Sequence, residues 1–361
     1  MLNPLLFFFK NKKSAFIIST TLLVSVFCIS FITILINSVY ATSKEANISP
    51  FESFSMLTYV GDNKDNAHKE IEQNEDIDTF FNVVVSYTSI NTVFGTTSSY
   101  IVFLDDESKL TDVLSRCDLH LQDGTISSLA ENEIIMHHNL LKNKKLDIGS
   151  NIDNFEIVGT FSGDNKLSFG IISQEKLENH GTGEVSYLVF PKDNKLAQLN
   201  QSLLNLDESE WATYSYLEAT NFLNESFSTI NLVLLIIVIM VSVCLSTAVA
   251  ALVYTVYSNR YDEFAILNAI GYKKSKIKIM LFQEITIITL FSWLLGYGAS
   301  LIFSVLIDIL IYADMGQTMP IATADGVLYT LIVPILVTIC AVFPAIRKLS
   351  RTDLVSIIER R

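Results

Sequence analysis

The sequence lacks the short motifs that mark the common enzyme classes. It has no G-x-x-x-x-G-K-[ST] phosphate loop, so the chain is not by itself a P-loop ATPase. It also has no G-x-S-x-G, H-E-x-x-H or C-x-x-C motif. The adjacent His137 and His138 point in different directions on a strand or a helix, which disfavours joint metal binding, so we interpret both as surface residues. These absences predict a protein that is not an enzyme and binds no metal or cofactor of its own.

Cysteine is scarce as well. Cys28, Cys244 and Cys340 lie within long apolar runs, and Cys117 is alone in the polar part of the chain. A single cysteine cannot form a disulfide within that part, so a hydrophobic core must hold it together. We expect Cys117 to be a buried apolar residue rather than a reactive thiol.

Charged residues make up only 17% of the chain and hydrophobic residues 50%, which excludes an ordinary water-soluble domain. The apolar residues form four runs of about 20 residues or more, the length that crosses a bilayer. The runs are residues 14–40, 228–257, 279–312 and 326–346. One run precedes and three follow a polar segment, residues 41–227. We therefore predict an α-helical membrane protein with four transmembrane helices in a one-plus-three arrangement, the first of them a retained anchor.

Positive charge is nearly absent from one side of the predicted membrane. Residues 41–227 carry 12 Lys and Arg against 30 Asp and Glu. The other 13 Lys and Arg lie in residues 1–13, 258–278 and 347–361. The positive-inside rule makes these three segments cytoplasmic, the first as an interfacial segment. Residues 41–227 and the short loop 313–325 are then extracellular. Their acidic excess fits either steering of cationic peptides or a well-solvated surface.

The extracellular segment alternates strand-like and helix-like stretches. NVVVSYTSI and SSYIVFLD are rich in β-branched and aromatic residues, as strands are. ESKLTDVLSRC comes next, with Leu110, Val113 and Leu114 at helical spacing. We predict an α+β domain inserted between transmembrane helices 1 and 2.

Glycine and proline are absent between Trp211 and Tyr257. One long helix, a stalk, is therefore predicted to run from the extracellular domain through the second span. The alternative is a surface helix that breaks at the membrane interface.

Small residues recur every four positions on the second and third spans. Such stripes let helix backbones approach closely, so we expect these faces to pack within the bundle or across a dimer. The stripes are Ser242, Ser246 and Ala250, and Ser292, Gly296 and Ser300.

Two acidic residues stand in apolar surroundings. Glu284 lies near the cytoplasmic end of the third span, where it could pair with Lys278, Lys276 or a neighbouring helix, or serve coupling. Asp308 lies near the extracellular end, where we expect water to solvate it.

The loop 258–278 is basic and contains a glycine stop, which predicts a short amphipathic helix at the membrane surface. Together with the start of the third span, it reads NRYDEFAILNAIGYKKSKIKIMLFQEITII. This stretch resembles the FtsX/MacB-type ABC permease signature, E-I-A-I-L-R-A-I-G with a basic stretch and a glutamate-opened helix after it. Asn268 and Phe264 depart from the pattern. WLLGYG, FPAIRKLSRTDLVSIIE and the stretch from Asp123 to Gly159, similar to the MacB-type extracellular core, extend the resemblance. The matching residues are Arg260, Glu263, Ala265, Ile266, Leu267, Ala269, Ile270, Gly271 and Glu284.

The resemblance implies a permease in a bacterial cell membrane that dimerises with a second copy or a homologous permease. It implies that residues 260–271 contact a separate ABC ATPase, which binds the ATP. ATP-driven motion would pass through the stalk to the extracellular domain for export of peptide, antimicrobial or lipid-linked cargo. Lipids and an accessory extracellular protein are further expected partners; nucleic acid is not. The alternatives are an FtsX-like regulator of a cell-wall hydrolase and a signalling or sensor subunit.

Overall fold

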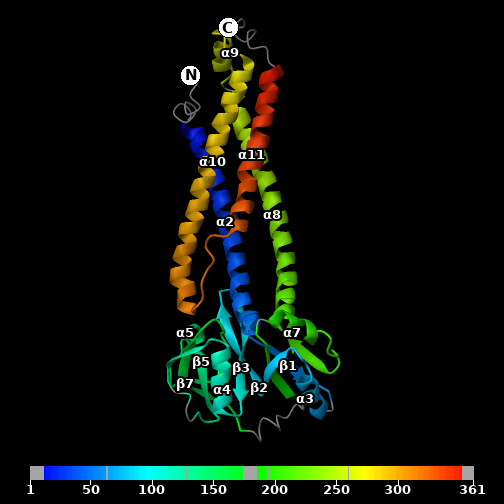
Figure 1. The fold of residues 1–361 in the computed structure, drawn as a ribbon. Helices are drawn as coiled ribbons and strands as arrows, with labels where there is room; N and C mark the ends of the chain where they lie inside the picture. The colour runs from blue at the N-terminus through cyan, green and yellow to red at the C-terminus, as the bar shows by residue number, and fades with distance from the viewer. Residues whose placement is uncertain are drawn as a thin grey trace. The chain divides into compact units, whose positions relative to one another are not determined.

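The computed structural model describes residues 12–61, 64–93, 95–124, 126, 129–173, 185–193, 195–258 and 260–351. Most of the predicted interfacial segment 1–13 and of the tail 347–361 lies outside the described residues. The chain divides into two compact units (Figure 1). We call them the membrane unit (Met1–Asn37, Thr229–Leu306 and Pro320–Arg361) and the sheet unit (Ser38–Ser228 and Ile307–Met319).

Among the residues that the structure describes, four helices are long and apolar enough to cross a membrane. They are α2 (Lys12–Asn47), α8 (Tyr216–Ser258), α10 (Lys274–Ile307) and α11 (Ala324–Arg351). One short helix, α9 (Tyr261–Ala269), lies between α8 and α10. The predicted arrangement of one helix before and three after an extracellular-type domain is confirmed.

Several helices extend beyond the predicted spans. The uninterrupted helix predicted from the lack of glycine and proline is confirmed by α8, which contains 43 residues. Helix α10 continues as a π-helical turn, η2 (Asp308–Tyr312), and a 3-10 turn, η3 (Ala313–Met315). Asp308 is not simply solvated as expected, because its Oδ1 accepts a hydrogen bond from the Met319 amide at 2.8 Å.

The small residues of α10 pack against α2 within the membrane unit. The Ser292 hydroxyl lies 2.7 Å from that of Ser19, and the Ser300 hydroxyl lies 2.6 Å from that of Ser30. Between them, a Cβ added to Gly296 would lie 2.6 Å from the carbonyl oxygen of Leu23. The stripe therefore sets a close α2–α10 approach.

Substitution of Gly296 by alanine is expected to destabilise the membrane unit by about 1–3 kcal/mol, because the added methyl overpacks the backbone of α2. Gly298→Ala is the matched control, since no atom lies within 4 Å of its added Cβ. Unfolding of both purified variants in micelles measures the difference. Equal stability of the two would contradict this packing.

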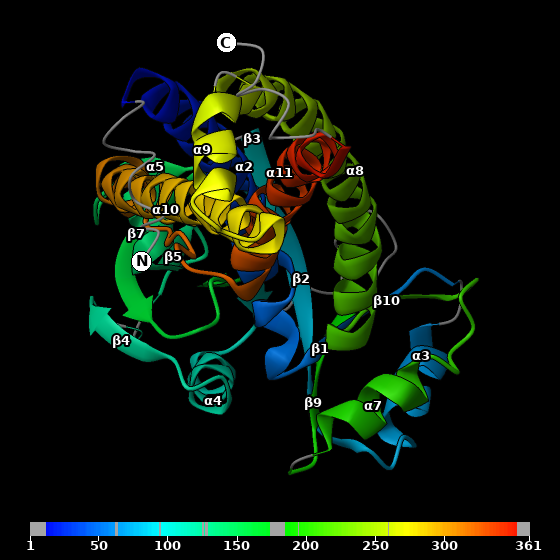
Figure 2. The same cartoon turned by 90° about the horizontal axis from the view of Figure 1, so that it is seen from above.

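The stripe on α8 also faces the interior. Ser242 and Ser246 are fully buried, and Ala250 is partly buried against the core of the membrane unit. Helices α10 and α11 are joined by polar contacts, with the Thr289 hydroxyl 2.9 Å from that of Thr338. Figure 2 shows the same ribbon from above.

The sheet unit is built on a ten-stranded mixed sheet of order β10-β1-β9-β2-β3-β8-β5-β7-β4, with β6 paired to β7. The β3–β8 and β5–β7 pairs are parallel and the others antiparallel. The α+β prediction is thus confirmed. The strands are β1 (Ser55–Tyr59), β2 (Ile77–Thr92), β3 (Gly95–Leu104), β4 (His120–Asp123), β5 (Glu133–His137), β6 (Asn151–Ile152), β7 (Phe155–Ser162), β8 (Ser168–Ile171), β9 (Val185–Pro191) and β10 (Trp211–Tyr214).

In the described part of the sheet unit, four helices and a 3-10 turn accompany the strands, in addition to the ends of α2 and α8 and to η2 and η3. They are η1 (Ser49–Glu52), α3 (Lys64–Glu72), α4 (Glu107–Arg116), α5 (His138–Lys144) and α7 (Leu196–Leu203). Leu110, Val113 and Leu114 of α4 face the core, as their spacing predicts. Cys117 is buried as expected, and burial raises the pKa of its thiol to about 12, which keeps it unreactive.

The ends of α2 and α8 within the sheet unit pack on each other. The rings of Tyr40 and Phe227 lie 4.9 Å apart, and the Tyr40 hydroxyl donates to Asn224 Oδ1 at 3.2 Å. Ile48 and Leu223 are buried in the same cluster. Two helices thus form the base of the predicted stalk.

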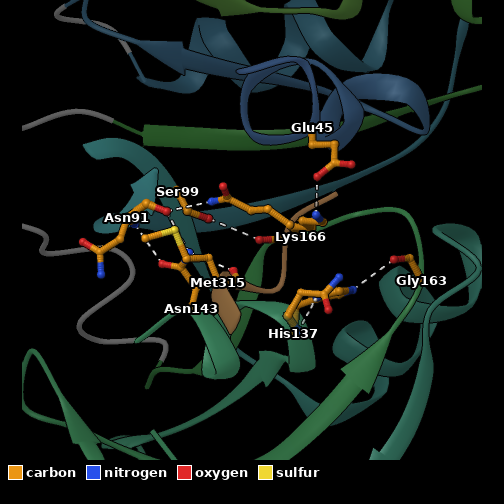
Figure 3. Close-up of polar contacts among 10 residues, drawn as sticks. Glu45, Asn91, Ser99, His137, Asn143, Gly163, Lys166 and Met315 are labelled. Carbon is orange, nitrogen blue, oxygen red and sulfur yellow. Dashed lines mark hydrogen bonds and ion pairs between the residues drawn. The ribbon is translucent and has the colours of Figure 1, made fainter. Parts of the chain in front are cut away.

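The segment after α10 is fastened to the sheet unit by the Asn143 side chain (Figure 3). Asn143 accepts from the Asn91 amide at 2.8 Å and donates to the carbonyls of Asn91, at 2.8 Å, and Met315, at 3.0 Å. Gln317 Nε2 also donates to the Asn91 carbonyl, at 2.7 Å. Gly316, in the left-handed region at φ 62°, lies against the backbone of Asn139 so closely that a Cβ would meet its carbonyl at 2.5 Å. Residues 313–319 of the predicted loop 313–325 are therefore an integral part of the sheet unit.

The prediction that His137 and His138 are both surface residues is wrong for His137, which is buried at the junction of β5 and α5. Its Nδ1 accepts from the Asn139 amide at 3.2 Å and caps α5, while its Nε2 lies 3.0 Å from the Gly163 carbonyl (Figure 3). Burial, aided by nearby positive charge, lowers the pKa of His137 to about 4.

This burial predicts acid sensitivity of the sheet unit. The unfolded chain takes up a proton on His137 near its ordinary pKa of 6.5, but the folded chain does so only near 4. Stability should therefore fall by up to about 3 kcal/mol as the pH decreases through this window. Hydrogen exchange in residues 133–144 of the full chain, compared at pH 7 and pH 4.5 and corrected for intrinsic rates, measures this loss of stability. His120→Gln, at an exposed site, should leave the change intact, whereas a pH-independent stability would contradict the account.

Candidate functional site

The connection between α8 and α10 folds differently from the single basic amphipathic helix that the sequence suggests. Helix α9 ends at Ala269, and Gly271 adopts a φ of 102°, a conformation that favours glycine. Helix α10 then begins at Lys274, so Lys274, Lys276 and Lys278 belong to its first turns and not to α9. Helix α9 itself carries Asp262 and Glu263 in its first turn, where they match the helix dipole.

Arg260, immediately before α9, joins this helix to the third span. Its Nε donates to Glu263 Oε2 at 3.0 Å, and its Nη1 donates to Glu284 Oε2 on α10 at 2.9 Å. The guanidinium also lies over the ring of Phe264, with 5.3 Å between Cζ and the ring centroid. The sequence analysis offers an ion pair with Lys278, Lys276 or a neighbouring helix as one role for Glu284. The structure shows an ion pair, and the partner is Arg260.

The Arg260–Glu284 pair is withdrawn from solvent. Glu284 is fully buried and Arg260 is 8% exposed. Removal of one member of a buried pair leaves an uncompensated charge, which typically costs about 3–5 kcal/mol. The pair therefore fixes the start of α9 to α10 as one body.

The residues matched to the family signature separate into two sets. Arg260, Ala265 and Glu284 face the interior, and Leu267 packs partly against the same core. Outward-facing residues form the second set, which we call the α9 face: Ile266, Ala269, Ile270 and Gly271. Ile266 is 54% exposed and Ile270 is 70% exposed. Arg260 is thus placed to hold the helix, whereas the α9 face is placed for contact.

The sequence analysis identifies Phe264 only as a departure from the FtsX/MacB-type signature. Its spacing of four residues from Arg260 on a helix was the signal that the two side chains meet. Its ring is fully buried and supports the guanidinium.

Among the residues that the structure describes, no group of three His, Cys, Asp or Glu is arranged to hold a metal ion. Arg260 bridges the carboxylates of Glu263 and Glu284, and we call these three ion-paired residues the Arg260 clamp.

Comparison with known proteins gives a family match and similar solved structures, among them the following two. Residues 232–354 match the model of the FtsX-like permease C-terminal family. The periplasmic region of MacB from Actinobacillus actinomycetemcomitans is 11% identical, covering 49% of this chain and 94% of that one, with a TM-score of 0.27. The extracellular domain of the noncanonic ABC-type transporter YknZ from Gram-positive bacteria is 10% identical, covering 44% and 98%, with a TM-score of 0.26. No curated protein matches the chain.

The matched residues 232–354 begin within α8 and include α9, α10 and α11, so they contain the whole Arg260 clamp and the α9 face. This part of the chain is therefore similar to the C-terminal part of FtsX-like permeases.

Proposed function

We propose that this chain is the permease subunit of an ABC transporter and that it transmits ATP-driven motion from a separate ATPase to the sheet unit. The observation that carries the proposal is the combination of an exposed apolar α9 face with a buried clamp behind it. Because the α9 face is rigidly joined to a membrane helix, a partner that pushes on this face moves the membrane helix and does not merely bend α9.

The clamp supplies the first step of transmission. A partner that moves α9 also moves α10, because Arg260 is bonded to Glu263 on one helix and to Glu284 on the other. Helix α9, which begins at Tyr261, follows the end of α8 at Ser258 closely in the sequence.

Helix α8 supplies the second step. It contains 43 residues without a break, a length of about 65 Å, and its first turns belong to the sheet unit. Its packing on α2 through Tyr40 and Phe227 makes the base of the stalk a two-helix structure. The Asn143 contact to Met315 holds η3, which follows α10 in the chain, within the sheet unit.

The clamp and the basic start of α10 support a cytoplasmic position for α9, and both termini would share that side of a bacterial cell membrane. The sheet unit would then lie outside, acting on peptide, antimicrobial or lipid-linked cargo. A dimer with a second copy or a homologous permease completes the proposed complex.

Purification of the chain in a mild detergent, with mass spectrometry of the proteins that accompany it, tests the proposal. We expect an ABC ATPase in stoichiometric amount. A complex with a sensor kinase and no ATPase would contradict the proposal. A cell-wall hydrolase bound together with the ATPase would replace export by hydrolase regulation.

A further inference from the structure

The sheet unit contains a hollow of about 440 Å³ that the proposed coupling does not use. It lies between the end of α2, η1, strands β3 and β10, and the start of α8. Four aromatic side chains line it, those of Phe51, Tyr100, Tyr214 and Phe222. Phe222 is 73% exposed, so the hollow offers apolar surface that this chain itself does not cover. Its size is that of a small-molecule site.

The aromatic rings are grouped closely enough to act together. The ring centroids of Phe51 and Tyr100 are 6.1 Å apart, and Tyr87 extends the group with its centroid 5.3 Å from that of Tyr100. Burial raises the pKa of Tyr100 to about 12, so its hydroxyl stays neutral. Aromatic faces carry partial negative charge and attract cations, most strongly organic ammonium groups.

One carboxylate, Glu218, completes the lining. Ser215 caps the start of α8: its hydroxyl accepts from the Glu218 amide and donates to Glu218 Oε2, both at 3.3 Å. Among the residues described, no lysine, arginine or histidine forms an ion pair with Glu218, and none lines the hollow. A cation entering the hollow would therefore meet an acceptor with no competing positive charge.

We propose that this hollow binds an organic cation in which an ammonium group is attached to an apolar body. The rings hold the apolar body and the ammonium edge, and Glu218 balances the charge. The surrounding charge favours such a ligand, since residues 41–227 carry 30 acidic against 12 basic residues. This binding needs no ATPase, so it stands or falls independently of the coupling proposed above.

Fluorine NMR of 4-fluorobenzyltrimethylammonium, titrated into the full chain in uncharged maltoside micelles, tests the proposal against empty micelles. We expect saturable binding of the cation and at least tenfold weaker binding of its neutral analogue, in which carbon replaces nitrogen. Glu218→Gln should weaken cation binding about tenfold. The Glu218 backbone amide still donates to Ser215, and a glutamine side-chain oxygen can accept from the Ser215 hydroxyl, so this variant should keep its fold. Phe222→Ala should also weaken binding, whereas Glu156→Gln, a carboxylate on β7, should not.

Three results would overturn the proposal. Equal binding of the neutral analogue would make the hollow a purely apolar site. Unchanged binding by Glu218→Gln would place the cation elsewhere. Absence of saturable binding would show that the hollow is closed to ligand, for example by a second copy of the chain.

Discussion

Arg260→Glu is expected to abolish the transmission of ATP-driven motion while the chain still inserts in the membrane. The substitution would place a third carboxylate beside Glu263 and the buried Glu284, and it would remove the cation that joins α9 to α10. The local cost is about 3–5 kcal/mol or more, enough to detach α9 from α10. The purified complex should continue to hydrolyse ATP, but hydrolysis should no longer drive motion of the sheet unit.

Other substitutions at the clamp rank the expected effects. Glu263→Lys should have a smaller effect than Arg260→Glu, because the Glu263 side chain is about one-third exposed. The double substitution Arg260→Glu with Glu284→Arg exchanges the two charges, so the buried pair keeps one charge of each sign. It should restore part of the coupling. Lys276→Glu, at an exposed position outside the clamp, is the matched charge reversal and should leave coupling unchanged. Unchanged coupling in both Arg260→Glu and Glu263→Lys would contradict a role for the clamp.

Ile266→Asp combined with Ile270→Asp is expected to prevent the ATPase from binding without unfolding the membrane unit. Both side chains are more than half exposed in this chain, so a charge there is tolerated until a partner must bury it. Loss of two buried isoleucines forfeits about 3–6 kcal/mol, equivalent to at least a hundredfold weaker association. Co-purification of the ATPase with the tagged chain measures this loss.

Ile148→Asp is the matched control for the α9 face. Ile148 is a similarly exposed isoleucine, but it belongs to the sheet unit. Its substitution should leave ATPase recovery at the level of the unsubstituted chain. Retention of the ATPase by the double α9 variant would show that the partner binds elsewhere.

The membrane helices could be predicted from the sequence because the bilayer imposes a length and an absence of charge that are visible in the residues themselves. The continuity of α8 was equally accessible, since no glycine or proline interrupts it. Helix ends were less accessible. The extension of α2 to Asn47 depends on packing of Tyr40 and Ile48 against α8, and no local signal records that contact.

The sequence predicts which residues form the candidate site, but it does not predict which of them contact each other. Arg260, Glu263 and Glu284 were all identified, yet Arg260 and Glu284 are 24 residues apart, and only the fold shows that they form a pair. Likewise, nothing in the loop 313–325 indicates that Asn143 holds it, because a hydrogen bond to a backbone carbonyl leaves no trace in the sequence of the acceptor. The prediction that His137 is exposed failed for a related reason. Its ring can be buried because Nδ1 accepts a hydrogen bond from the Asn139 amide at the start of α5, and the sequence does not reveal this contact.

Hydrogen exchange in the complex of the chain with its ATPase, measured with and without ATP, tests the central claim most directly. In the unsubstituted complex, ATP should change exchange both in α9 and in residues 216–228, where α8 belongs to the sheet unit. In Arg260→Glu, the change in residues 216–228 should disappear although ATP is still hydrolysed. Hydrolysis without any change there in the unsubstituted complex, or an identical change in the variant, would contradict transmission through the Arg260 clamp.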